Sequence, residues 1–141
     1  MAGGIPLMLT PRQVSASTFA VVAATCVAEG HVGLGVVVTA TLATSLVVHR
    51  PRASYTGADR SACDALDPLG CLAWVAMVAV ELCVHWVSAT AWCLALVGGC
   101  FVGTRVLPYR SGPRDAAQVC MHLAASLGTI ALVRCHRTGL P

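Results

Sequence analysis

Three long apolar stretches dominate the chain and constrain how it can fold. The first runs from Val14 to Val48, interrupted only by Glu29-Gly30-His31; the second runs from Leu69 to Gly103, and the third from Ala116 to Val133. A helix of about 20 apolar residues crosses the hydrocarbon core of a bilayer, which is roughly 30 Å thick. Each stretch is therefore long enough to supply one or two membrane-spanning helices.

The shortage of charge supports the same interpretation. Charged residues make up only 11% of the 141 residues, whereas a soluble domain carries about 25%. A soluble domain of this size would need a largely polar surface. Membrane spans are helices or closed barrels, and these stretches lack the alternation of barrel strands. We predict an all-α protein: one polytopic membrane domain over residues 1–141, with four to five short transmembrane helices.

The first two stretches each divide into a helical hairpin, because a helix of 35 residues would be about 52 Å long. Glu29-Gly30-His31 is the predicted first turn, since glycine permits a sharp reversal. Ser88-Ala89-Thr90 is the predicted second turn, flanked by Trp86 and Trp92, a residue type that gathers at membrane interfaces. The expected spans lie near 12–29, 32–49, 69–87, 90–106 and 117–133, with polar loops at 49–68 and 105–115.

The third stretch carries polar residues at helical spacing, namely Gln118, His122, Ser126 and Thr129. Such residues form one stripe along a helix. The stripe suits either a span that faces the bundle or a weakly amphipathic interfacial helix. We favour the span, because no basic residues flank the polar face.

All nine basic residues are arginines, and their placement predicts the orientation. Seven lie on one side if both hairpins enter the bilayer from it: Arg12, Arg50, Arg52, Arg60, Arg105, Arg110 and Arg114. By the positive-inside rule, that side is cytoplasmic. If the third stretch spans, Arg134 and Arg137 lie on the other side. A second interpretation of the N-terminus, as a signal peptide cleaved after Ala28, is disfavoured because its basic region would hold only Arg12.

Glu81 and His85 are the sharpest candidates for an intramembrane polar site. They are four residues apart and so share a helix face. A charge at mid-membrane costs at least about 2.5–3.5 kcal/mol, which makes such a residue a functional hypothesis by default. We favour a structural role, in which Glu81 is protonated or bonded to His85. Glu29 and His31 lie toward the same membrane face, while His122 lies nearer the other face and is expected to donate an interhelical hydrogen bond.

Small residues at four-residue spacing predict close helix packing. Ala95, Gly99 and Gly103 form one such row, and Ala124 and Gly128 form a similar pair. Rows of this kind let helix backbones approach closely in membranes.

The eight cysteines include no C-x-x-C pair, which argues against zinc-ribbon and thioredoxin-like sites. Six lie inside the apolar stretches, where cysteine behaves as a small hydrophobe. Cys135 lies between Arg134 and His136 at the end of an apolar stretch, a position suited to palmitoylation.

No catalytic motif, metal motif or cofactor motif is found, and no basic patch with aromatic residues indicates nucleic-acid binding. We therefore expect a non-enzymatic interaction, assembly or trafficking component. Its partners would be the lipid bilayer and other membrane proteins or further copies of itself. The alternative is a small oligomeric transporter or proton-coupled channel that uses Glu81 and His85. The absence of Lys and Asn indicates a G+C-rich gene, and with the chain's size it fits small multi-span envelope proteins of large DNA viruses, in a host membrane or virion envelope.

Overall fold

Five helices in succession make up the part of the chain that the structure describes. The computed structural model describes residues 10–48, 57–108 and 111–138. Its helices are α1 (Pro11–Ala28), α2 (Val32–Val48), α3 (Gly57–Val84), α4 (Ser88–Val106) and α5 (Gly112–Thr138). No strand occurs within these ranges. The predicted all-α class is thus confirmed.

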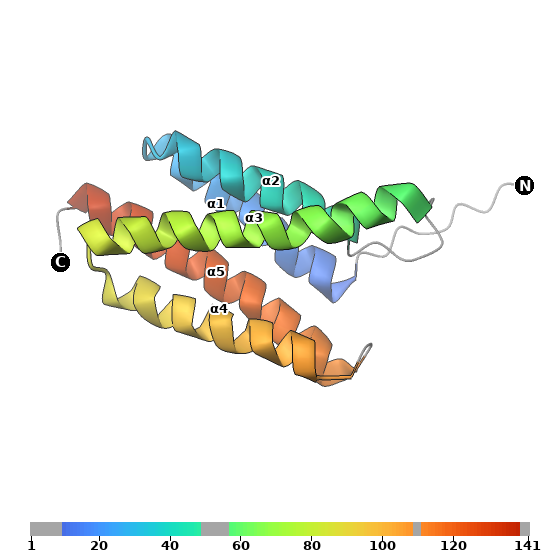
Figure 1. Ribbon diagram of the computed structural model, residues 1–141. Helices are drawn as coiled ribbons and strands as arrows, with labels where there is room; N and C mark the ends of the chain where they lie inside the picture. Colours follow the sequence, from blue (N-terminus) through green and yellow to red (C-terminus); the bar gives the residue numbers. More distant parts are fainter. Residues whose placement is uncertain (1–9, 49–56, 109–110, 139–141) are drawn as a thin grey trace, which may run out of the picture.

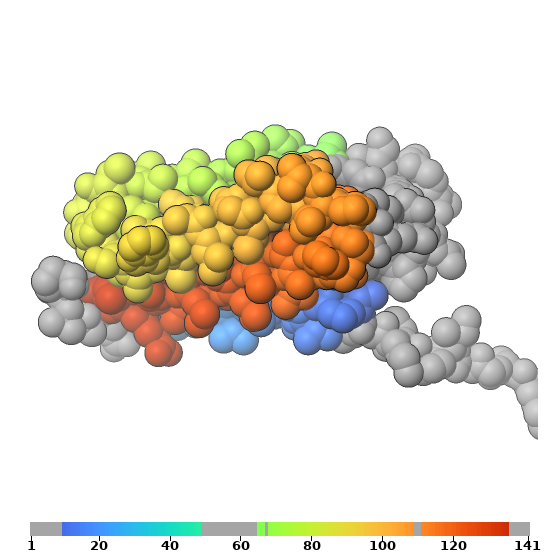
Figure 2. Space-filling model, turned by 90° about the horizontal axis from the view of Figure 1, so that it is seen from below, coloured from blue at the N-terminus to red at the C-terminus, as the bar shows by residue number. Residues whose placement is uncertain are grey.

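The helices alternate in direction, so the bundle has two distinct ends (Figure 1). We call the end where α1, α3 and α5 begin the arginine end, and the end with the α1–α2 and α3–α4 turns the turn end. Helix α5 packs extensively on α1 and α4, and α2 packs on α1 and α3. Contact of α3 with α4 and α5 is sparse. Figure 2 shows α4 along the outside of the bundle, beside α5.

The first hairpin follows the local sequence closely. Thr10 caps α1, because its hydroxyl accepts a hydrogen bond from the Gln13 backbone N–H at 3.3 Å while its own N–H donates to the Gln13 side chain at 3.0 Å. This reciprocal pair is a capping box. Helix α1 ends at Ala28, and Gly30 has a φ of 87°, in the region that glycine enters without steric cost. The predicted turn at residues 29–31 is confirmed.

The second turn lies three residues earlier than predicted. Helix α3 ends at Val84 and α4 begins at Ser88, so the expected Ser88-Ala89-Thr90 turn is instead the first turn of α4. Val87 adopts an extended conformation and precedes the helix. The hydroxyl of Thr90 donates to the Gly128 carbonyl of α5 at 2.9 Å. Thr90 was assigned to a turn because of its residue type, but it lies in a helix and bonds to a neighbouring helix.

The two predicted polar loops are shorter than expected. Residues 57–68, assigned to the first loop, belong to α3, which contains Pro68; residues 49–56 lie outside the described ranges. Alanine, leucine and arginine in this segment favour helix. In the second loop, α4 extends to Val106 and α5 begins at Gly112. Pro113 falls in the first turn of α5, where proline is well tolerated.

The bundle is apolar outside and partly polar inside. Large hydrophobic side chains are exposed on all five helices, among them Val21, Val36, Leu72, Val102 and Leu127. Among the residues whose burial the structure describes, nine polar side chains are buried, namely Gln13, Ser15, Thr41, Ser45, Thr90, Thr104, His122, Ser126 and Thr129. The helices Ser88–Val106 and Gly112–Cys135 are long and apolar enough to cross a membrane, and Val32–Val48 and Pro68–Val84 are shorter apolar helices. Two of the five helices in the described ranges therefore meet the length and apolarity of a membrane span.

Close helix packing occurs at Gly128, one of the predicted small pair Ala124 and Gly128, and at Gly70, which was not predicted. A Cβ added at Gly128 would lie 2.7 Å from the Cβ of Cys93 in α4, and one added at Gly70 would lie 2.9 Å from the Thr41 hydroxyl in α2. Two residues of the predicted row, Ala95 and Gly99, make no close helix contact within the described part of the chain. Ala95 is exposed, and a Cβ at Gly99 would meet only open space. Only Gly103 lies against α5, where an added Cβ would be 3.7 Å from Ala117.

The Gly128 contact gives a direct test of the α4–α5 packing. We expect Gly128→Ala to destabilise the protein, because the overpacking penalty of about 1–3 kcal/mol outweighs the gain in helix propensity of about 1 kcal/mol. Gly98→Ala is the matched control, since its Cβ would meet nothing within 4 Å and it should be neutral or stabilising. Unfolding of the purified protein in mixed micelles measures both variants. Equal stability of the two variants would contradict this packing.

Candidate functional site

A cavity of about 320 Å³ lies inside the bundle and is lined from all five helices. Its walls are predominantly apolar. The buried part of the lining includes Phe19, Val38, Trp74, Val97, Met121 and His122. The lining segments, 68–75 of α3, 94–101 of α4 and 121–125 of α5, lie near the middle of their helices, and Phe101 is the lining residue of α4 nearest the arginine end. Its volume is at the lower end of the roughly 300–1,000 Å³ range of small-molecule sites.

The cavity lies where α3 packs on α2 and makes few contacts with α4 and α5. One buried hydrogen bond crosses to α5: the indole Nε1–H of Trp74 donates to the Thr129 hydroxyl at 2.9 Å. Thr129 in turn donates to the Ala125 carbonyl at 2.8 Å. Trp74 therefore forms part of the cavity wall and also ties α3 to the rest of the bundle.

His122 lies at the back of the cavity and is only 2% exposed. Its Nδ1 is 2.9 Å from the Ser15 hydroxyl, and its Nε2 is 3.2 Å from the Gln118 amide nitrogen. With the Gln118 amide donating to Nε2, the ring proton sits on Nδ1 and is donated to Ser15. Ser15 then donates to the Arg12 carbonyl at 3.0 Å. The polar chain from α5 to α1 is thus satisfied with a neutral imidazole.

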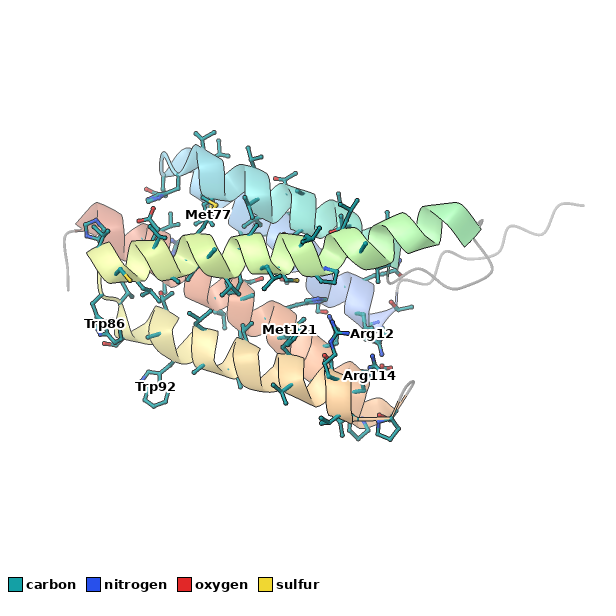
Figure 3. The ribbon with its side chains drawn as sticks, in the orientation of Figure 1. Arg12, Met77, Trp86, Trp92, Arg114 and Met121 are labelled. Carbon is teal, nitrogen blue, oxygen red and sulfur yellow. The ribbon has the colours of Figure 1, made fainter. Side chains whose placement is uncertain are left out.

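Two further polar contacts flank His122 between α1 and α5. Thr18 and Ser126 share a hydrogen bond of 2.7 Å, and Arg12 forms an ion pair with Asp115 at the arginine end. Figure 3 shows Arg12 and Arg114 at this end, with Met121 further along the bundle. The edge of the Phe19 ring contacts His122, with ring centroids 5.4 Å apart. These contacts show that the predicted stripe of α5 faces the bundle.

The other predicted polar residues lie outside the cavity, at the turn end. Glu29 and His31 lie in the α1–α2 turn, Glu81 lies in the last turn of α3, and His85 directly follows that helix. Glu81 is half-buried and His85 is exposed. None of the four lines the cavity. These four residues therefore lie at one end of the bundle, and the described cavity contains no polar route from Glu81 and His85.

The remaining candidate residues add no further chemistry to the cavity. Cys135, the candidate for lipidation, is half-buried near the end of α5 and packs against the core. Within the described ranges, no group of three or more metal-ligating side chains comes together. Trp86, which lies in the second turn, and Trp92, which lies in α4, are both exposed at the turn end (Figure 3).

Sequence reasoning missed Ser15 and Trp74, the partners of His122 and Thr129. Ser15 lies among similar residues in the segment Ser15-Ala-Ser-Thr18, so nothing distinguishes it locally. Trp74 follows the apolar pattern of its stretch. The usable signal was indirect: a buried histidine or threonine in a membrane helix requires a partner on another helix.

Comparison with protein-family models, with curated proteins and with solved structures finds no match for this chain. The interpretation of the cavity therefore rests on its own geometry.

The Ser15–His122 hydrogen bond predicts a stability difference between two serines of α1. Ser15→Ala should destabilise the bundle by about 0.6–1.7 kcal/mol, the range for interhelical hydrogen bonds in membranes. Ser17→Ala is the matched control, because Ser17 is exposed and donates only to the Val14 carbonyl of its own helix. A double-mutant cycle with His122→Ala, measured by unfolding in mixed micelles, gives the coupling energy. A coupling energy near zero would show that this hydrogen bond does not stabilise the bundle.

Proposed function

We propose that the chain is an integral membrane protein that crosses the bilayer five times and acts as a non-enzymatic interaction or assembly component. The inverted distribution of polarity carries the membrane part of the proposal. Valine, leucine and tryptophan side chains face outward, whereas serine, threonine and histidine side chains bond to one another between helices. In water this arrangement would expose apolar surface on every side. In lipid it is favourable, because polar groups must be satisfied internally.

Helix length and direction support five spans. At 1.5 Å per residue, the helices of 17–19 residues are about 26–29 Å long, and α3 and α5 are about 40 Å long. These lengths suit a hydrocarbon core of roughly 30 Å. Because the helices alternate in direction, three of the described arginines, Arg12, Arg105 and Arg114, lie at the arginine end, whereas Arg134 lies toward the turn end. The positive-inside rule then assigns that end to the cytoplasm.

The interaction role draws support from small residues that the chain leaves uncovered. Ala95 and Gly99 are exposed on α4, and they share a face because they are four residues apart. Small residues at this spacing let a second helix approach closely. Since α5 does not use this face, we propose that a helix of another membrane protein, or of a second copy, packs there.

The orientation predicts which single cysteines an impermeant thiol reagent can reach from outside intact cells. All eight native cysteines are first replaced by alanine or serine. Ser88→Cys, at the turn end, should react, whereas Ser111→Cys, at the arginine end, should react only after permeabilisation. Gly139→Cys in the C-terminal tail should behave like Ser88→Cys if α5 spans. Reaction of Ser111→Cys alone in intact cells would reverse the orientation, and a tail that matches Ser111→Cys would leave four spans.

The interaction role predicts a specific crosslinked species. Because the chain has no lysine, a photo-crosslinker that does not react through amines is used. Gentle detergent extraction after crosslinking should recover the protein with a partner or a second copy. Ala95→Leu with Gly99→Leu should greatly reduce that species, because the larger side chains block close approach. Val36→Leu is the control, since Val36 is an exposed apolar residue of α2 and its change should have no effect. Recovery of monomer alone from native membranes would contradict the proposal.

A further inference from the structure

The cavity has a mouth on the side of the bundle, between α3 and α4. Three of its lining residues there are exposed: Leu72 by 64%, Phe101 by 40%, and Gly98. A Cβ added at Gly98 would meet nothing within 4 Å, so the wall is open at this point. The inference that follows rests on the proposed membrane location, under which this mouth faces hydrocarbon.

The chemistry of the wall favours a hydrocarbon occupant over water. A stably bound water requires two to four polar partners. The polar side chains of the lining already have partners: Thr41 donates to the Val37 carbonyl at 2.9 Å, and both ring nitrogens of His122 are engaged. The volume of about 320 Å³ lies within the size range of apolar ligand sites. A single extended acyl chain entering from the bilayer meets these limits.

A positive charge lies just beyond the mouth. The exposed Arg105 is one turn beyond Phe101 on α4, and its guanidinium lies 5.0 Å from the centre of the Phe101 ring. The ring positions the cation and contributes no negative charge to offset it. Arginine can contact a phosphate through two parallel hydrogen bonds. A lipid whose chain entered beside Phe101 would therefore carry its phosphate toward Arg105.

The positive charge of the residues near this end of the bundle favours an anionic lipid. Among the residues at the arginine end whose side chains the structure describes, Arg12, Arg105 and Arg114 carry three positive charges and Asp115 carries one negative charge, so the balance there is positive. A zwitterionic lipid brings its own cation to this region and gains less from it. Basic residues near a membrane surface attract anionic lipids by about 1 kcal/mol each.

We propose that the cavity binds one acyl chain of an anionic phospholipid from the leaflet at the arginine end, with Arg105 contacting the lipid phosphate. The occupant enters laterally between Leu72 and Gly98. The chain fills the apolar volume in front of His122, and the headgroup stays at the membrane surface.

Trp74 provides a reporter inside the cavity, because it lines the wall and is only 7% exposed. With Trp86→Phe and Trp92→Phe, it is the only tryptophan left of three. This variant is reconstituted into vesicles containing phosphatidylglycerol or phosphatidylcholine with brominated chains. Bromine quenches tryptophan fluorescence on close approach. We expect quenching of Trp74 to show that brominated phosphatidylglycerol binds in the cavity with roughly five-fold higher affinity than brominated phosphatidylcholine, as about 1 kcal/mol of charge attraction implies.

Two substitutions test the mouth and the headgroup contact separately. Gly98→Leu should strongly reduce quenching of Trp74 by either lipid, because its side chain would occupy the entrance. Ala40→Leu is the control for added bulk, since Ala40 is exposed on α2 and does not line the cavity. Arg105→Gln should remove the roughly five-fold preference and leave quenching by phosphatidylcholine unchanged. The inference would be overturned if both lipids quenched Trp74 equally and if neither Gly98→Leu nor Arg105→Gln changed that quenching.

A second reporter separates failure of the lipid site from failure of the membrane location. With Trp74→Phe and Trp86→Phe, only Trp92 remains, and it is 78% exposed on α4. Both lipids, brominated near the headgroup, should quench Trp92 if the bundle lies in the bilayer. No quenching of Trp92 would refute the membrane location itself. Quenching of Trp92 without any quenching of Trp74 would leave that location standing and refute the lipid-filled cavity.

Discussion

The polar face of α5 is the feature on which the rest of the bundle depends. In a hydrocarbon setting, helices gain little by burying apolar surface against one another, so packing and interhelical hydrogen bonds must hold them together. Helix α5 supplies such bonds to three neighbours. Its partners are Arg12, Ser15 and Thr18 on α1, Trp74 on α3 and Thr90 on α4. Because these contacts occur on α5 residues from 115 to 129, they fix its rotation as well as its position.

The same arrangement explains why the interior contains a cavity. Helix α3 is held closely against α2, where Gly70 accommodates Thr41, but it reaches α5 by one buried hydrogen bond from Trp74. Protein interiors are ordinarily packed with few voids. An apolar gap next to a bilayer differs from one in a soluble core, because hydrocarbon from the lipid can fill it. Under the proposed membrane location, the loose packing of α3 therefore leaves an apolar space that a lipid chain can occupy.

Local signals predicted the helices well and the contacts between them poorly. The apolar stretches and Gly30 located α1 and α2, because span length and left-handed backbone conformation are properties of short segments. The early start of α3 was missed because Asp, Arg, Gly and Pro were interpreted as loop residues, although charged residues are acceptable where a helix leaves the hydrocarbon. The spacing of Ala95 and Gly99 identified a smooth helix face but not its partner, and that face is exposed in the described part of the chain. The cavity had no local signal, since it arises from contacts that α3 does not make.

The position of each titratable group along the bundle then distinguishes structural from surface roles. His122 is deep in the bundle, and both of its ring nitrogens are occupied by Ser15 and Gln118, so its polarity is used in assembly. Glu81 and His85 lie at the turn end, close to the exposed Trp86 in sequence, where the desolvation cost of a charge is smaller than at mid-membrane. Neither group contributes polarity to the cavity. A conduction route would need polar groups distributed along its length, whereas here the polar groups bind one another between helices and leave an apolar wall. That division supports contact with lipids and partner helices as the chemistry for which this bundle is suited.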